Sequence, residues 1–334
     1  MTFLIQQTML YAVPLMLVAL AGVCAERSGT INLALEGIMI FGAFIGVVFI
    51  RAMQANGFTS DMGQLLMLLT LLVTGISGAI FSLLLAFSAV TLKADQTIGG
   101  TALNMLSPAI VLFFIVLIAQ QNTLGMAEGG AASWFMIKPS TFGLPKDYSW
   151  GIFDVFINKV YLSTYICILI FILVSIFLYK TKIGLRLRSC GENPQAADSL
   201  GINVYKMRYL GVMMSGFLAG AGGFQFALTV SNCTSTGAVA GYGFLALAVM
   251  IFGNWTPINI ALGAMLFGLF KCIAAVYATL DINGDGVCLL ANLNISPYVY
   301  RMLPYVITLI VLAFTSKKSR VPKAEGIPYD KSAR

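Results

Sequence analysis

Long apolar runs recur along this chain, and they constrain its fold more than any other feature. A helix needs about 20 residues to cross about 30 Å of hydrocarbon. Lipid offers backbone groups no water partner, so such runs must cross as helices, and the chain is predicted to be an all-α polytopic membrane protein. The candidate crossings are Leu4–Val23, Ile38–Ile50 with the preceding Gly29–Gly37 region, Leu65–Val90, Ile98–Ala119, Val160–Tyr179, Met207–Val230, Val239–Phe252, Ile258–Leu280 and Pro297–Phe314.

Composition excludes a soluble globular protein. Hydrophobic residues make up 59% of the chain and charged residues 10%, whereas soluble domains carry about 25% charged residues. The net charge of +7 is confined to two segments, Tyr179–Arg208 and Ser316–Arg334. Cytoplasmic loops of membrane proteins carry such a basic excess. We therefore place both segments, and so the C-terminus, in the cytoplasm, and expect membrane lipid and no nucleic acid as a partner.

The missing residue types argue against catalysis by this chain. Histidine is absent, which excludes Ser-His-Asp and Cys-His nucleophiles and His-ligated metals. Asp281–Gly286 matches the first half of a calcium loop, but the twelfth position is Asn292 rather than Glu, so we expect no metal. A disulfide between Cys233 and Cys288 stays open. No phosphate-binding loop occurs, so we expect no cofactor here and ATP bound only by another chain.

The polar segment Tyr179–Arg208 carries signals for a short capped helix. Asn193 is a good N-cap, and Pro194 suits the first helical position. Helix-forming residues follow, and Gly201 can adopt the left-handed conformation that ends a helix. An ordinary polar connector is the simpler alternative, but it would need none of these signals. We interpret the segment as a surface offered to a cytoplasmic partner. The residues predicted to carry coupling are Glu192, Asn193, Pro194, Ala196, Ala197, Asp198 and Gly201.

Two polar clusters lie beside apolar runs. In Glu26–Gly37, ERSGTINLALEG, a helix interruption is tolerable only where it faces protein or a wet cavity. A substrate path is one such place; the alternative puts Glu26 and Arg27 at the membrane surface and pairs Glu36 with a buried group. The cluster at Lys93–Asn104 could bind a polar solute or let helices pack closely. The predicted pathway residues are Asn32, Glu36, Gln96 and Asn104.

An intramembrane lysine and two glycine patterns complete the intramembrane features. Lys271 falls near the middle of an apolar run, so it is expected to face a partner or a cavity, with Glu36 as its candidate partner. The pairs Gly216-x-x-x-Gly220 and Gly237-x-x-x-Gly241 would permit close helix contacts.

The topology is clear in the second half of the chain and open in the first. Counting outward from the basic loop returns the tail to the cytoplasm; counting backward places residues 120–159 and the N-terminus outside. The second count stays open, because Leu65–Val90 is long for one crossing and Gly29–Gly37 looks like a broken helix. We predict one transmembrane domain at residues 1–315, with a coupling loop at 180–206 and an external loop at 120–159, followed by a basic tail at 316–334.

Three stretches together carry a family resemblance: Glu26–Gly37 (ERSGTINLALEG), Leu92–Asn104 (LKADQTIGGTALN) and Gly184–Val204 (GLRLRSCGENPQAADSLGINV). They resemble permease subunits of bacterial ABC importers in the branched-chain amino acid and ribose permease superfamily, nearest to its nucleoside and simple-sugar branch. The resemblance implies a type II-like importer fold of about 8–10 transmembrane helices, with a discontinuous helix near Gly29–Gly37 beside the pathway. It also implies that Asn193–Gly201 is the coupling helix.

The resemblance further implies partners and a place in the cell. These are an ATPase subunit with duplicated nucleotide-binding domains that holds Mg-ATP, a second and paralogous permease, and an external solute-binding lipoprotein, at the bacterial cytoplasmic (inner) membrane. The implied function is ATP-driven import of nucleosides or simple sugars. The alternative is an ion- or proton-coupled secondary transporter in which Glu36 and Lys271 titrate; a membrane enzyme is disfavoured by the missing histidines. The substrate, and whether the second permease is a copy of this chain, stay open.

Overall fold

The computed structural model describes residues 2–137, 160–277, 296, 298–300, 302–304, 306–307, 309 and 320–331. Every regular element in these ranges is a helix, and seven helical segments are long and apolar enough to cross a membrane. The predicted all-α polytopic membrane fold is confirmed. The elements are α1 (Thr2–Glu26), α2 (Leu35–Ala55), η1 (Ser60–Met62), α3 (Gly63–Ala86), η2 (Phe87–Thr91), α4 (Gln96–Ala119), α5 (Ala131–Trp134), α7 (Leu162–Lys180), α8 (Lys182–Glu192), α9 (Pro194–Ser199), α10 (Val204–Thr229), α11 (Tyr242–Phe252) and α12 (Pro257–Val276).

The centre of the bundle is formed by α1 and α10. In the most apolar 18-residue stretch of each helix, 89% of α1 and 78% of α10 is buried. Helix α10 packs against α1, α2 and α3. Glycine makes the close approach possible, because a Cβ on Gly220 would lie 2.4 Å from the carbonyl oxygen of Thr74. The first predicted glycine pattern therefore does pack helices. The second is wrong as a helix-packing motif, since Gly237 and Gly241 lie in a non-helical segment with φ of +71° and +74°.

The outer helices expose apolar side chains. In the corresponding apolar stretches, only 22% of α4 and 28% of each of α7 and α12 is buried. On α4, Ile98, Met105 and Phe113 are 69%, 78% and 65% exposed. A continuous apolar face of this kind would be costly in water, whereas lipid tails cover it without cost. The chain is a multi-pass membrane protein.

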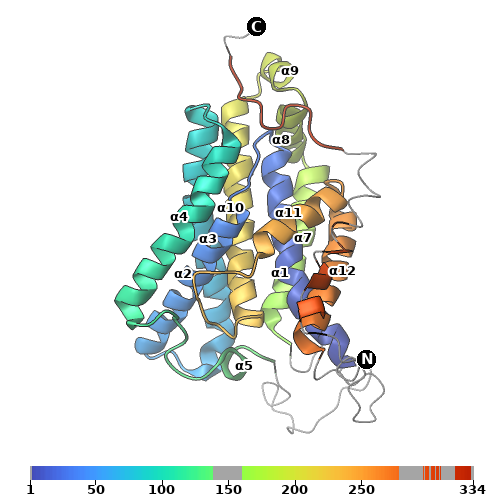
Figure 1. The fold of residues 1–334 in the computed structure, drawn as a ribbon. Coiled ribbons are helices and arrows are strands. Elements are labelled where there is room, and N and C mark those ends of the chain that lie inside the picture. The colour runs from blue at the N-terminus through green and yellow to red at the C-terminus, as the bar shows by residue number, and fades with distance from the viewer. Residues whose placement is uncertain are drawn as a thin grey trace.

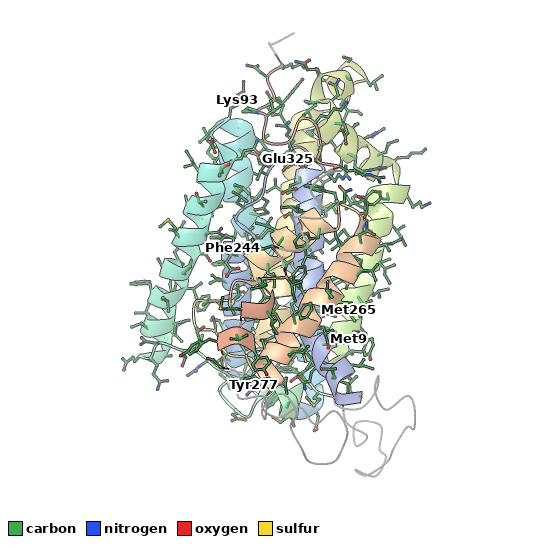
Figure 2. All side chains as sticks on the ribbon, turned by 45° about the vertical axis from the view of Figure 1, so that its right-hand side comes forward. Met9, Lys93, Phe244, Met265, Tyr277 and Glu325 are labelled. Atoms are coloured by element: carbon green, nitrogen blue, oxygen red, sulfur yellow. The ribbon has the colours of Figure 1, made fainter. Side chains whose placement is uncertain are left out.

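The two ends of the molecule differ in what they carry. Figure 1 shows α9 and the C-terminus at one end and the N-terminus at the other. The end with α9 and the C-terminus, which we call the α9 end, also carries Lys93 and Glu325 (Figure 2). The N-terminus lies at the end opposite α9. This agrees with the backward count of crossings from the basic loop, which places the N-terminus on the opposite side of the membrane from that loop. Ser60–Thr91 is one continuous 32-residue helical segment, so it hides no second passage.

Several predictions fall on residues that the structure does not describe. The calcium-like Asp281–Gly286, its Asn292, and Cys288 all lie outside the described ranges. Cys233 is a buried free thiol. The predicted boundary at residue 315 and most of the 120–159 loop also lie outside, so the domain division stays a prediction.

Candidate transport and coupling site

The chain between α1 and α2 is not helical. Helix α1 ends at Glu26 and α2 begins at Leu35, with Gly29 at φ +92° between them. The predicted interruption is therefore present as a non-helical segment, residues 27–34, which we call the break. Because α1 and α2 are each long enough to cross a membrane, a helix broken within one crossing stays a prediction. The N-cap position of α2 is Ala34, which offers no side-chain acceptor. The first amides of a helix have no partner within it, so other residues must satisfy those of α2.

Asn104, on α4, supplies much of this missing capping. Its Oδ1 accepts a 2.7 Å hydrogen bond from the amide of Gly37, and its Nδ2 donates over 2.6 Å to the carbonyl oxygen of Leu33. Ser107, one turn later, donates over 2.6 Å to the carbonyl oxygen of Gly37. A single amide side chain thus satisfies one backbone donor and one backbone acceptor that lipid would leave unpaired.

Two further side-chain amides, those of Gln96 and Asn32, form hydrogen bonds at the break. Gln96 accepts a 2.7 Å bond from the amide of Ile31 through Oε1, while its buried Nε2 has no hydrogen-bond partner in the described part of the chain. Asn32 donates over 2.8 Å to Oγ of Ser215 on α10 and accepts from the amide of Ala34 at 3.0 Å. The structure therefore gathers the predicted pathway amides of two separate sequence clusters around residues 27–37.

Glu36, the fourth predicted pathway residue, connects the break to a second interrupted crossing. Segment 230–241 is largely non-helical and leads into the short α11. Glu36 accepts hydrogen bonds from the amides of Gly241 at 3.0 Å and Gly243 at 2.6 Å. A carboxylate is favourable at the start of a helix, because it satisfies orphan N–H groups and the positive end of the helix dipole. Glu36 therefore caps α11 from within the first turn of α2.

Lys271, on α12, reaches the same turn. Its Nζ donates over 3.4 Å to the carbonyl oxygen of Ala240 and lies 5.1 Å from the ring centre of Tyr242. Glu36 and Lys271 thus hold neighbouring residues of one turn, through amides and a carbonyl respectively. Whether function requires their opposite charges stays a prediction.

The capped helix predicted in the polar segment is confirmed at each of its signals. Asn193 is the N-cap and accepts from the amide of Ala196 at 3.0 Å, Pro194 is the first helical residue, and Gly201 follows at φ +77°. Ala197 is the buried residue of α9. Leu200, just beyond it, is 81% exposed. A single exposed apolar side chain is common on protein surfaces, so the role of α9 as a contact surface stays a prediction.

The end of α8, which leads directly into α9, contacts the break. Glu192, at the end of α8, forms a 3.5 Å ion pair with Arg27 at the end of α1. Gly191 packs so tightly that an added Cβ would lie 2.4 Å from the carbonyl oxygen of Arg27 and 3.1 Å from the amide nitrogen of Gly29. The predicted coupling residue Glu192 therefore joins two regions that lie 165 positions apart in sequence.

Sequence reasoning missed several residues of this site. Arg208, counted as a cytoplasmic surface charge, is 1% exposed, and its Nη1 donates over 2.8 Å to the carbonyl oxygen of Ile327. Trp255 donates from Nε1 to Oε2 of Glu26 at 2.5 Å. The hydroxyl of Thr30 is buried with no hydrogen-bond partner among the described residues. Nothing local in the sequence identifies the contacts of Arg208 and Trp255, because each joins distant parts of the chain.

Comparison with known proteins now bears on this arrangement. A family model described as "Branched-chain amino acid transport system / permease component" matches residues 4–312. The chain belongs to this permease family. The permease is 39% identical over 98% of its length to the nucleoside ABC transporter permease protein NupC of Lactococcus lactis subsp. cremoris, covering 97% of that relative. It is 37% identical to the guanosine ABC transporter permease protein NupQ of Bacillus subtilis, over 100% and 98% of the two chains.

A more distant relative comes from the same organism as NupC. The nucleoside ABC transporter permease protein NupB of Lactococcus lactis is 22% identical over 96% of the permease and 82% of its own length. No solved structure matches the permease significantly. The similarity to NupC and NupQ covers both parts of the site, the break at residues 27–34 and the α9 region.

Proposed function

We propose that this permease is the membrane subunit of an ATP-driven importer of nucleosides, located in the bacterial cytoplasmic membrane with α9 and the C-terminus facing the cytoplasm. The similarity to NupC and NupQ over essentially the whole chain supports the substrate class. The basic residues around α9 support the orientation, since cytoplasmic loops carry this excess.

The observation that carries the proposal is the connection between α9 and the break. A capped helix with an exposed Leu200 lies beyond the ends of the crossing helices, and the end of α8 that leads into it contacts Arg27 and Gly29 through Glu192 and Gly191. A partner that moves α9 would therefore move the break. We propose that this partner is an ATPase with duplicated nucleotide-binding domains, and that it alone binds Mg-ATP.

The same geometry supports our proposal for the pathway. Asn32, Glu36 and Asn104 hold the backbone of the two interrupted crossings, so we assign them to shaping the path. Gln96 has a buried donor group without a partner in the described residues, and Thr30 has a buried hydroxyl in the same condition. Nucleosides offer carbonyl, ring-nitrogen and hydroxyl groups that such donors can bind. We assign Gln96 and Thr30 to transient contact with the solute.

Two further partners complete the proposal. NupC and NupB, two nucleoside permeases of one organism, support a pair of different permeases around one path. An external solute-binding lipoprotein would deliver the nucleoside to the face opposite α9.

The test is to purify the permease from native membranes and to identify the proteins that accompany it. An ATPase and a second permease should co-purify, and cells lacking the permease should lose uptake of radiolabelled guanosine and other nucleosides. Gln96→Met should slow uptake while leaving the complex intact. Co-purification without nucleoside uptake would overturn the substrate; uptake that persists in energised cells lacking the ATPase would support an ion-coupled transporter instead.

A further inference from the structure

The C-terminal segment, defined as residues 320–331, lies across the α9 end of the molecule (Figure 1). At its start, the amide of Arg320 donates over 2.6 Å to Oδ1 of Asn254, in the turn between α11 and α12. Near its end, Asp330 forms a 3.0 Å ion pair with Lys93, in the turn before α4. The segment therefore spans turns that lie far apart in the sequence, and what it contacts between them determines its role.

Near its C-terminal end, the segment shares an apolar cluster with α9. Tyr329 is 6% exposed and belongs to a small apolar cluster with Cys190, Ala197 and Val204. Its ring centre lies 5.4 Å from that of Tyr205 in an edge-to-face arrangement. Ala197 is the buried residue of α9, so the Tyr329 ring belongs to the apolar cluster in which that helix buries its side chain. A helix of six residues has little stability of its own and depends on such packing.

The middle of the segment, residues 324–327, contacts the break and the residues beside it. The amide of Gly326 donates over 3.3 Å to the carbonyl oxygen of Gly29, and the amide of Ala324 donates over 2.8 Å to that of Gly191. Gly326 has φ +73°, and an added Cβ would lie 2.8 Å from Cδ1 of Ile31. The guanidinium of Arg208 holds the next residue through the carbonyl oxygen of Ile327 at 2.8 Å. The turn at residues 324–327 is thus fixed to the break by backbone hydrogen bonds.

We propose that the C-terminal segment is a positioning element of coupling, which transmits displacement of α9 to the break between α1 and α2. Tyr329 follows α9, residues 324–326 follow Gly29 and Gly191, and the short chain between them is held by Arg208. The segment adds a second connection to the Arg27–Glu192 ion pair. This inference rests on the proposed function, in which a partner moves α9.

The decisive variants act at Tyr329. Tyr329→Ala removes the ring beneath α9, whereas Tyr329→Phe keeps it. Val321→Ala is the matched control, because Val321 is an apolar residue of the same segment that is 44% exposed. We expect ATP-driven uptake by the reconstituted complex to fall about tenfold or more in Tyr329→Ala, within the range typical of coupling between sites. Uptake should be near wild-type in Tyr329→Phe and Val321→Ala, and the ATPase should co-purify with all three variants.

Hydrogen exchange separates transmission from simple packing. In Tyr329→Ala, exchange should accelerate in peptides covering residues 191–203 and also in those covering 25–34, while the interior of α10 stays protected. Gly326→Ala acts at the opposite end of the segment and should produce the same two changes; it decides the question if Tyr329→Ala does not fold. Normal uptake in the folded variant, or faster exchange around α9 alone with residues 25–34 still protected, would overturn the proposal.

The wild-type complex distinguishes this inference from the function on which it rests. If the wild-type permease shows no ATP-driven uptake with its co-purified partners, the proposed function fails. If the wild type transports and Tyr329→Ala transports equally well, the proposed function stands and the role of the C-terminal segment is refuted.

Discussion

Replacing Asn104 by Leu tests whether the polar residues of the site hold the broken crossing in place. The substitution conserves size but removes the bonds to the amide of Gly37 and the carbonyl oxygen of Leu33. Each buried backbone group left unpaired costs about 1–3 kcal/mol, so two should destabilise the permease by about 2–6 kcal/mol. Ser107, one turn later on α4, already donates its hydroxyl proton to the carbonyl oxygen of Gly37, so it cannot also donate to the carbonyl oxygen of Leu33.

The control for this prediction is Thr101→Val on the same helix. The Thr101 hydroxyl binds only carbonyl groups of its own helix, those of Thr97 and Ile98, and the residue is exposed. Its loss should therefore cost less than about 0.5 kcal/mol. Denaturant unfolding of the two purified variants in detergent measures both values. If Asn104→Leu is as stable as Thr101→Val, the account of the break as a segment held by side-chain hydrogen bonds is refuted.

Three other predictions concern the rest of the site. Ala197→Pro removes the 3.1 Å bond from its amide to the carbonyl oxygen of Asn193 and costs about 3 kcal/mol or more, so uptake should be lost while the external binding protein keeps its affinity for solute; normal uptake would argue against α9 as the coupling element. Exchanging Glu36 and Lys271 tests their charges: if opposite charges suffice, the double variant should recover uptake lost in Glu36→Gln and Lys271→Gln, and a well-expressed but inactive double variant would show that the hydrogen bonds to the turn matter instead. Burial raises the pKa of Glu325 to about 7, against the opposing charge of Arg27. The folded state then favours the neutral carboxyl, so the C-terminal segment should be held most firmly below pH 4.5, the ordinary pKa of this carboxyl, and should loosen as the pH rises through about 7. Hydrogen exchange at residues 320–331 should show this pH dependence, and Glu325→Gln should remove it.

Local signals in the sequence predict the parts of the site that are set locally. The cap at Asn193, the first-turn Pro194 and the left-handed Gly201 each act within a few residues, and the structure has all three as predicted. The interruption after Glu26 is also signalled locally, because Gly29 and the polar residues around it interrupt the apolar pattern. Its conformation, however, depends on distant side chains such as Asn104.

Features that depend on distant contacts could not be predicted in this way. The spacing of Gly237 and Gly241 resembles a packing motif, yet both residues adopt left-handed conformations in a non-helical entry to α11. Arg208 looks like a surface charge until the C-terminal segment covers it. Glu36 is predicted to be the partner of Lys271, which does act on it electrostatically, but the sequence does not show that its oxygens also accept hydrogen bonds from two amides more than 200 positions away. Each outcome depends on which segment folds onto which, and no local pattern encodes that.

The central claim is that a separate ATPase drives this permease through α9. The direct measurement is nucleoside accumulation in vesicles reconstituted with the permease and its second permease, loaded with ATP, and supplied with the external binding protein, with and without the ATPase. We predict accumulation above the external concentration only when the ATPase is present, and its loss with Ala197→Pro. Accumulation without the ATPase, driven by an ion or proton gradient, would contradict the account.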